Sequence, residues 1–125
     1  MARKPALQLA REWFDMASDG DTAGMADLLA DDALFHAEQL RGWRFDGRNE
    51  IEAFLAQTGF EANGYSYTPV DDEYVVVTVS LRRHMPNGGL ADSTLAMVVK
   101  AEGEEIVCLD AFQSEAEALR SISSA

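Results

Sequence analysis

Asp110 is the acidic residue whose surroundings best suit proton transfer, because it lies between Leu109 and Ala111 on a predicted strand. A carboxyl group in an apolar cavity has its pKa raised by desolvation, toward the range in which a general acid or base works near neutral pH. The alternative places Asp110 on the polar face of the strand, in solvent or at a subunit contact, where most charged residues lie. The direction of its side chain decides between these hypotheses.

His84 and Asp92 flank the turn at residues 86–89, and a carboxylate that faces an imidazole across a hairpin makes an acid–base pair. The structural alternative is a cross-strand ion pair between Arg82 and Asp92. Strand register decides which of these two residues lies opposite Asp92.

His36 is the second histidine, on a short predicted strand beside Phe35 and Ala37. Side chains alternate along a strand, so His36 points away from those two neighbours. Either the imidazole touches a ligand pocket, or it is a partly buried structural group. The two histidines and the acidic residues near them lack the close spacing of metal ligands, so we predict neither a metal site nor a cofactor.

Length, net charge and cysteine content limit the classes of protein to which this chain can belong. The 125 residues, of which 47% are apolar, suffice for a sizeable core, and we predict a single domain over residues 1–125. The net charge of −12 disfavours nucleic acid and anionic membrane surfaces as partners. No apolar run reaches the ~18 residues needed to cross a bilayer. Cys108 is the single cysteine, which fits a reducing compartment, so we expect a cytoplasmic protein.

Hydrophobic periodicity divides the chain into helices followed by strands. An amphipathic helix over residues 5–18 turns Trp13 and Phe14 to one face, and Gly20 ends it. A short second helix carries Leu28 and Leu29 inward. The remaining elements are predicted as a brief strand at 33–37, a helix at 48–57, strands at 65–70, 74–84, 90–101 and 106–112, and a final helix capped by Ser114.

The long strands alternate between apolar and polar residues, so one face of their sheet must be buried. Three helices with one embedded strand, followed by consecutive hairpins, predict an α+β fold. We expect a curved antiparallel sheet that wraps the three N-terminal helices, with a short helix at the C-terminus.

Several runs of sequence, in this order, resemble the nuclear transport factor 2-like superfamily and, within it, bacterial SnoaL-like domains. Gly20-Asp21 follows the amphipathic helix, residues 28–33 read LLADDA, and residues 45–51 read FDGRNEI. The end of the last strand and the segment after it, FQSEAEAL at 112–119, are similar as well. The resemblance covers nearly the whole chain.

This resemblance implies a cone-shaped α+β barrel, open at one end, that usually forms a homodimer through its sheet. The relatives include ketosteroid isomerases, polyketide cyclases, epoxide hydrolases, dehydratases and proteins without catalytic activity, so the fold does not define the function. In such a cone, the core at the wide end is also the wall of the pocket. The residues expected in that wall are Trp13, Phe35, Trp43, Phe54, Tyr67 and Met97.

The catalytic residues of these relatives are mostly missing. By resemblance, the base of ketosteroid isomerase falls on Ala37, its helix tyrosine on Trp13 and its protonated aspartate near residues 95–97, so that mechanism is not expected. The aspartate of polyketide cyclases falls on Ala111, or on Asp110 if the register slides by one residue. One such slip moves a side chain to the opposite face of the sheet.

We therefore predict a protein that binds a small hydrophobic molecule. If it is an enzyme, we expect cofactor-independent acid–base chemistry of the isomerase, cyclase, dehydratase or hydrolase type, with Asp110 as acid or base and His36 or His84 as polar partners. The alternative is a non-catalytic ligand-binding or dimeric interaction module. A cavity lined only by apolar residues binds a ligand but transfers no proton, so the side chains that face the interior separate the two hypotheses.

Overall fold

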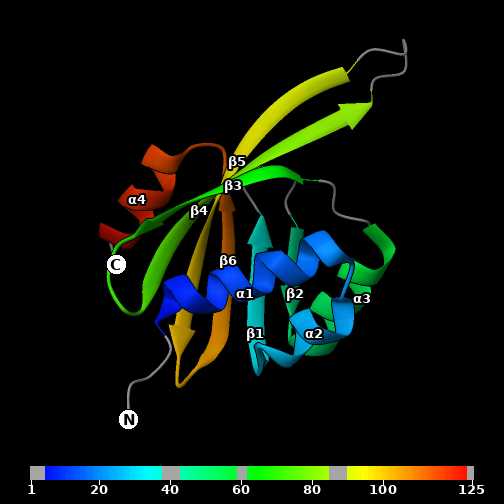
Figure 1. Ribbon diagram of the computed structural model, residues 1–125. Coiled ribbons are helices and arrows are strands. Elements are labelled where there is room, and N and C mark those ends of the chain that lie inside the picture. Colours follow the sequence, from blue (N-terminus) through cyan, green and yellow to red (C-terminus); the bar gives the residue numbers. More distant parts are fainter. Residues whose placement is uncertain (1–4, 38–42, 59–61, 85–89, 124–125) are drawn as a thin grey trace.

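Helices and one six-stranded sheet make up the part of the chain that the structure describes (Figure 1). The computed structural model describes residues 5–37, 43–58, 62–84 and 90–123, with the backbone alone at 43, 55–58, 62, 63, 81–84, 90–93 and 123. The helices are α1 (Ala6–Asp19), α2 (Thr22–Asp27), α3 (Arg48–Thr58) and α4 (Glu115–Ser123). The strands are β1 (Leu29–Ala37), β2 (Trp43–Asp46), β3 (Ala62–Pro69), β4 (Tyr74–His84), β5 (Leu90–Glu102) and β6 (Glu105–Phe112).

The sheet is mixed and open, with the strand order β2-β1-β6-β5-β4-β3. Neighbouring strands pair antiparallel except β1 and β6, which run parallel and place His36 beside Asp110. The α+β prediction is confirmed, but the expectation of a wholly antiparallel sheet is wrong at this one pairing. The relative orientation of β1 and β6 follows from the order of the hairpins from β3 onward. The residue pattern within either strand does not indicate whether the pair is parallel or antiparallel.

Strand pairing also moves several element boundaries. β1 begins at Leu29, which the sequence predicts in the second helix, whereas that helix ends at Asp27. The sequence predicts no strand between the one at 33–37 and the helix at 48–57, but β2 pairs antiparallel with β1 from Trp43 onward. β3 likewise begins at Ala62, before the predicted start at residue 65. In each case, hydrogen bonding to a neighbouring strand extends the strand beyond its hydrophobic pattern.

α1 lies across the strands in Figure 1 and covers the sheet on one side. Its apolar face is buried, as the periodicity predicts, through Ala6, Leu9, Ala10, Trp13, Phe14 and Ala17. Gly20 ends the helix in the left-handed region at φ 75°, where a residue without a side chain is favoured. The Asp21 carboxylate then accepts a 3.0 Å hydrogen bond from the Gly24 N–H and caps α2.

α4 covers the opposite side of the sheet. The Ser114 hydroxyl accepts a 3.2 Å hydrogen bond from the Glu117 N–H, which confirms the predicted cap of this helix. α4 contacts β4, β5 and β6. With these strands it buries a second apolar cluster, made of Val76, Ala96, Val98, Phe112 and Ala118. We call the face of the sheet beneath α1, α2 and α3 the inner face, and the face that carries α4 the outer face.

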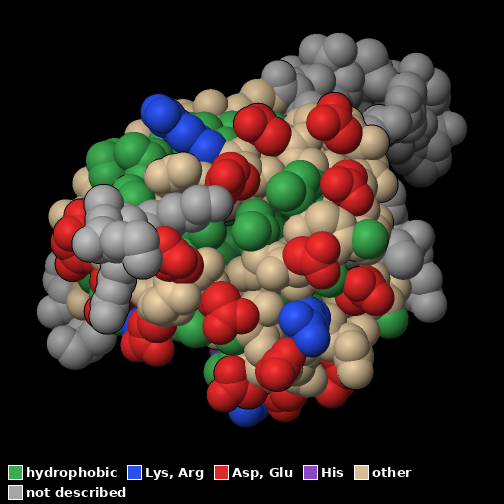
Figure 2. All heavy atoms as spheres, turned by 60° about the horizontal axis from the view of Figure 1, so that its bottom comes forward, with side chains coloured by type: hydrophobic (Ala, Val, Ile, Leu, Met, Phe, Trp, Pro, Cys, Tyr) green, Lys and Arg blue, Asp and Glu red, His purple; other side chains and the backbone are tan. Residues whose placement is uncertain are grey.

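Acidic side chains are spread over the surface, as Figure 2 shows for one side of the molecule. Two turns of the sheet, at residues 71–73 and 102–105, carry exposed acidic residues. This distribution agrees with the net charge of −12. In the described part of the chain, no helix is long and apolar enough to cross a membrane.

Candidate functional site

The inner face of the sheet is built from apolar side chains, with tyrosines on the edge strand β3. Its described members are Ala33, Phe35 and Ala37 of β1, Phe45 of β2, Tyr65 and Tyr67 of β3, Val75, Val77 and Val79 of β4, Leu95, Met97 and Val99 of β5, and Val107, Leu109 and Ala111 of β6. Among the described residues, no fully buried side chain is polar or charged. The described inner face of the sheet therefore offers neither a carboxylate nor an imidazole for proton transfer.

The residues expected in a pocket wall belong to this region where the structure describes their side chains. Trp13, Phe35 and Met97 are buried in the main core. Phe54 and Tyr67 are partly exposed and pack against that core. These five side chains thus lie together with the inner face, on the side of the sheet where α1, α2 and α3 pack.

The indole N–H of Trp13, its only polar side-chain group, is hydrogen-bonded within the protein. Its indole Nε1–H donates a 3.2 Å hydrogen bond to the carbonyl oxygen of Met25. An indole has no other donor, so Trp13 serves the packing of α1 on α2. For Trp43, the other tryptophan expected in the wall, the structure gives the backbone pairing with Ala37, and its side chain lies outside the described residues.

Three phenylalanines form a cluster where β1, β2 and α3 meet. The rings of Phe45 and Phe54 are stacked, with centroids 4.5 Å apart and an interplanar angle of 27°. Phe35 packs against both, with centroid distances of 6.1 Å to Phe45 and 5.7 Å to Phe54. Phe45 and Phe54 are only partly buried. Such half-covered aromatic rings suit contact with an apolar ligand.

Polar groups line the contact between α1 and the edge strand β3, which we call the α1–β3 seam. The ring of Tyr65 packs on Phe14 with centroids 4.9 Å apart, and its hydroxyl lies 3.3 Å from Ser18 Oγ. Ser18 Oγ also donates a 3.2 Å hydrogen bond to the carbonyl oxygen of Phe14. The Arg11 guanidinium lies over the ring of Tyr67, 5.4 Å from its centroid, in a cation–π contact.

Tyr67 is a proton donor rather than a base. Burial raises the pKa of its hydroxyl, and the negative charge of Asp15 and the neighbouring Tyr65 raise it further, against the lowering effect of Arg11. A tyrosine whose pKa is raised above its ordinary value of about 10 keeps its proton throughout the physiological range. Tyr67 can therefore donate a hydrogen bond there, but it cannot remove a proton from a substrate.

Asp110 and His36 lie on the outer face. Asp110 is half-buried on β6, while its neighbours Leu109 and Ala111 are buried in the main core on the inner side. The register of the parallel pair places His36 directly beside Asp110, on a strand about 4.8 Å away. The structure therefore brings two predicted catalytic residues together, but on the side away from the main core, and it is Ala111 that faces inward.

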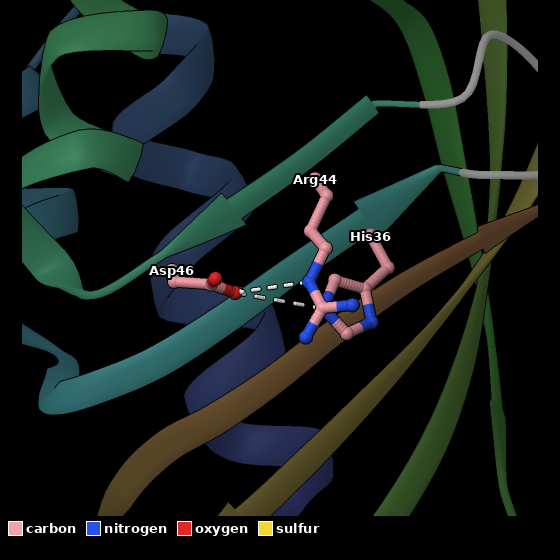
Figure 3. Close-up of polar contacts among 3 residues, drawn as sticks. All are labelled: His36, Arg44 and Asp46. Atoms are coloured by element: carbon pink, nitrogen blue, oxygen red, sulfur yellow. Dashed lines mark hydrogen bonds and ion pairs between the residues drawn. The ribbon is translucent and has the colours of Figure 1, made fainter.

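His36 also lies beside two charged residues of the edge strand β2, Arg44 and Asp46 (Figure 3). Its Nε2 atom is 3.9 Å from Asp46 Oδ1, too far for a hydrogen bond, and the same oxygen is 3.4 Å from Arg44 Nε. Nε2 is shielded from solvent and has no hydrogen-bond partner within the described residues. Because the Asp46 and Arg44 side chains are 55% and 59% exposed, this group is a loose arrangement at the sheet edge rather than a preorganised catalytic site.

Cys108 lies two residues before Asp110 on the same face of β6 and is half-buried. Burial raises the pKa of its thiol, and the Asp110 carboxylate raises it further, while Lys100 acts in the opposite direction. The thiol therefore stays protonated, and a protonated thiol is a poor nucleophile. In the parts of the chain that the structure covers, no three His, Cys, Asp or Glu side chains are grouped so as to hold a metal ion.

His84, the third predicted catalytic residue, is far from the other two along the sheet. It ends β4 opposite Leu90, whereas Asp110 lies opposite Val98, farther along β5. The register also places Arg82, and not His84, opposite Asp92. The backbone register thus favours the pairing of Arg82 with Asp92 over that of His84 with Asp92. The side chains of these hairpin residues lie outside the described part of the structure.

Tyr65, Ser18 and Phe45 belong to the site but are not among the residues predicted from the sequence. Tyr65 precedes Tyr67 by two residues, so alternation along the strand puts both on one face and could have identified it. No sequence pattern links Ser18 to Tyr65, because their contact depends on how α1 lies across β3. Phe45 lies outside the strands that the sequence predicts, because its strand is defined by pairing with β1.

Comparison with known proteins assigns the chain to a family. A family model described as the SnoaL-like domain matches residues 10–109. The chain therefore belongs to the SnoaL-like domain family, as the sequence resemblance predicts. No curated protein matches it significantly.

Several solved structures share this fold at low sequence identity. A candidate polyketide cyclase from Xanthomonas campestris is 18% identical, with a TM-score of 0.75, over 96% of this chain and 98% of that one. A Mycobacterium tuberculosis protein in complex with estradiol-17β-hemisuccinate is 13% identical, with a TM-score of 0.69, over 91% and 97%. A Catenulispora acidiphila protein in complex with trimethylamine is 17% identical, with a TM-score of 0.65, over 90% of each chain.

Proposed function

We propose that this protein binds a small apolar molecule between the inner face of the sheet and helices α1 and α3, and that it does so without proton-transfer catalysis. The observation that carries the proposal is the division of side chains between the two faces. The described inner face is apolar except for Tyr65 and Tyr67, while Asp110 and His36 lie on the outer face.

The aromatic residues of the inner side supply the means of binding. Phe45 and Phe54 are stacked and partly exposed beside the buried Phe35, and Tyr65 is partly exposed beside the buried Phe14. Burial of a ligand against such rings releases water from apolar surface, at about 25 cal/mol for each Å² covered. An apolar molecule is favoured over an ionised one, because the described inner face contains no charged partner that would offset desolvation.

The solved relatives support a small-molecule ligand. The Mycobacterium tuberculosis structure contains a steroid ester and the Catenulispora acidiphila structure contains trimethylamine. Their low identity to this chain gives the fold alone, so neither compound is assigned here as the natural ligand. The two compounds differ greatly in size, which agrees with a family that uses one fold for many ligands.

A titration with naphthalene, followed by backbone amide chemical shifts in NMR spectra, tests the proposal. We expect shifts at residues of the inner side such as Phe45, Tyr65 and Met97. Phe54→Ala removes part of the aromatic cluster and is expected to weaken binding about tenfold. Asp110→Asn and His36→Asn serve as matched controls on the outer face and should leave the affinity unchanged. Shifts confined to the outer face, or no binding at all, would contradict the proposal.

An acid–base enzyme is the second candidate, because His36 and Asp110 lie side by side on adjacent strands. A carboxylate beside an imidazole is a useful pair for moving a proton next to a carbonyl group. Such a reaction on the outer face needs another surface to enclose the substrate. The same Asp110→Asn variant separates the two candidates: conversion of a carbonyl compound by the wild type that is lost in Asp110→Asn would favour the enzyme over the binding protein.

We also propose that the protein forms a homodimer through the outer face. α4 covers the apolar centre of that face, and beside the covered area lie the half-buried residues Leu34, His36, Cys108 and Asp110. A partially covered face that combines apolar and polar groups has the composition of a subunit contact. Leu34 supplies the apolar part of this strip, so a substitution at that position tests the contact.

A further inference from the structure

The hydroxyl groups of Ser18 and Tyr65 are arranged so that each donates its hydrogen in a hydrogen bond within the protein. Ser18 Oγ lies 3.2 Å from the carbonyl oxygen of Phe14, which can only accept a hydrogen bond, so the single Ser18 hydroxyl hydrogen is donated there. Ser18 Oγ also lies 3.3 Å from the Tyr65 hydroxyl. Both contacts are hydrogen bonds at the same time only if Tyr65 is the donor in the second one.

The result of this arrangement is a pair of oxygens that can only accept. The Tyr65 hydroxyl donates its hydrogen bond to Ser18 Oγ, so its oxygen has only lone pairs left to offer, and Ser18 Oγ keeps one free lone pair after its two bonds. The ring of Tyr65 packs on the buried Phe14 and against the main core, while the bond between the two hydroxyls is exposed at the α1–β3 seam. A ligand that extends from the inner face to the α1–β3 seam would meet hydrogen-bond acceptors at this point.

We propose that the α1–β3 seam selects apolar ligands that carry a hydrogen-bond donor, such as a hydroxyl group, over ligands that carry only an acceptor. This inference rests on the proposed binding function and names the class of ligand for it. The Tyr65 oxygen accepts the donor of the ligand, and Ser18 fixes the orientation of the Tyr65 hydroxyl. Tyr65 is thus the contact residue, and Ser18 is a positioning residue that acts through it.

The acidic residue nearest the seam on the same face of α1 also favours a ligand that carries a donor. The carboxylate of Asp15 lies one turn of α1 before Ser18 and is close enough to Tyr67 to raise the pKa of that hydroxyl. A negative charge favours the donor end of a polar group over the acceptor end. The positive charge of Arg11 lies two turns of α1 before Ser18 and is placed over the ring of Tyr67. The hydroxyl pair therefore lies nearer along α1 to the acidic residue than to the basic one.

Two probes of similar shape test the inference. 2-Naphthol carries a hydroxyl donor, and 2-methoxynaphthalene carries only an acceptor at the same position. Their dissociation constants are measured by fluorescence titration for the wild type and for Tyr65→Phe, Ser18→Ala and Ser66→Ala. Ser66 is exposed on β3 and points away from the inner face, so Ser66→Ala is the matched loss of a hydroxyl outside the seam. The readout is the change in the ratio of the two dissociation constants from the wild type to each variant, in which the intrinsic difference in hydrophobicity between the probes cancels.

We expect Tyr65→Phe to reduce the preference for 2-naphthol about fivefold, the value of one hydrogen bond, while the affinity for 2-methoxynaphthalene stays near that of the wild type. Ser18→Ala should also reduce the preference, because the freed Tyr65 hydrogen can then donate to the methoxy oxygen. Ser66→Ala should leave the ratio unchanged. An unchanged ratio in both Tyr65→Phe and Ser18→Ala overturns the inference alone, whereas failure of both probes to bind the wild type overturns the proposed binding function with it.

Discussion

The inner and outer faces of the sheet share the same strands but differ in composition and in cover. On β6, Leu109 is completely buried in the main core, whereas its neighbours Cys108 and Asp110 are half-buried on the other side. On β1, Phe35 and His36 show the same contrast. Because successive side chains of a strand point to opposite faces, a step of one residue separates the packed interior from a polar surface strip. A carboxylate between two apolar residues of a strand is therefore on the far side from them.

This contrast decides how the candidate catalytic residues are understood. The apolar surroundings that raise a carboxyl pKa belong to Leu109 and Ala111, which face inward. The polar residues that could act on a substrate are His36 and Asp110, which lie side by side on the outer face, away from helices α1 to α3. Binding surface and proton-transfer groups are thus on different sides of one sheet, and the predictions below test that separation from the largest expected effect to the smallest.

The largest effect is expected for truncation of an inner-face side chain. Leu109→Ala removes a fully buried side chain and should lower the free energy of unfolding by about 3 kcal/mol, from lost burial and the cavity left behind. Cys108→Ala, one residue away on the outer face, should cost less than about 1.5 kcal/mol because that side chain is only half-buried. Urea unfolding followed by circular dichroism measures both, and equal losses would contradict the difference between the faces.

The next effect concerns self-association through the outer face. Leu34→Glu places a charge in the proposed subunit contact and should weaken dimerisation at least about tenfold, because an unpaired charge in an interface loses its hydration. Gln8→Glu adds the same charge on an exposed position of α1 and should leave dimerisation unchanged. Sedimentation equilibrium measures the dissociation constants. A wild-type protein that is monomeric at high concentration would refute the dimer.

The smallest effect concerns the thiol of Cys108. The Asp110 carboxylate contributes to the raised pKa of Cys108, so Asp110→Asn should increase the thiolate fraction and about double the rate of reaction with an aromatic disulfide at pH ~8. Asp15→Asn, a change of the same kind on α1, serves as the control. A rate that is the same in Asp110→Asn and the wild type would mean that the two outer-face residues do not interact.

The raised pKa of the Cys108 thiol also predicts how the stability of the protein depends on pH. The folded thiol holds its proton to a higher pH than the unfolded thiol, whose pKa is about 8.5. Above that pH the folded state binds more protons than the unfolded state, so the free energy of unfolding falls as the pH rises. Cys108→Ser lacks the titrating thiol, and its stability should therefore fall less than that of the wild type between pH ~8 and ~10.

Much of this fold was accessible from the sequence, because local patterns carry it. The apolar face of α1 follows from helical spacing, and the cap at Ser114 follows from residue type. For Asp110 the sequence leaves two alternatives open, and the structure places the side chain on the outer face of β6 with Cys108. The family assignment is confirmed by the match over residues 10–109.

The features that escaped prediction depend on contacts between distant parts of the chain. β2 is a strand because it pairs with β1, and the residues of β2 show no strong pattern of their own. The hydroxyl contact between Ser18 and Tyr65 depends on the angle at which α1 crosses β3, and the spacing of residues along the chain does not indicate that angle. The place of Asp110 beside His36 required the parallel pairing of β1 with β6.

That parallel pairing also has a consequence for how the chain reaches its native state. β1 is made early in synthesis, but its hydrogen-bonding neighbour β6 is the last strand of the sheet. The β1–β2 hairpin must therefore wait, with one strand edge open, until most of the chain has left the ribosome. Closing so long a loop is entropically costly, so the joining of β1 to β6 is expected to come late and to limit the rate of folding.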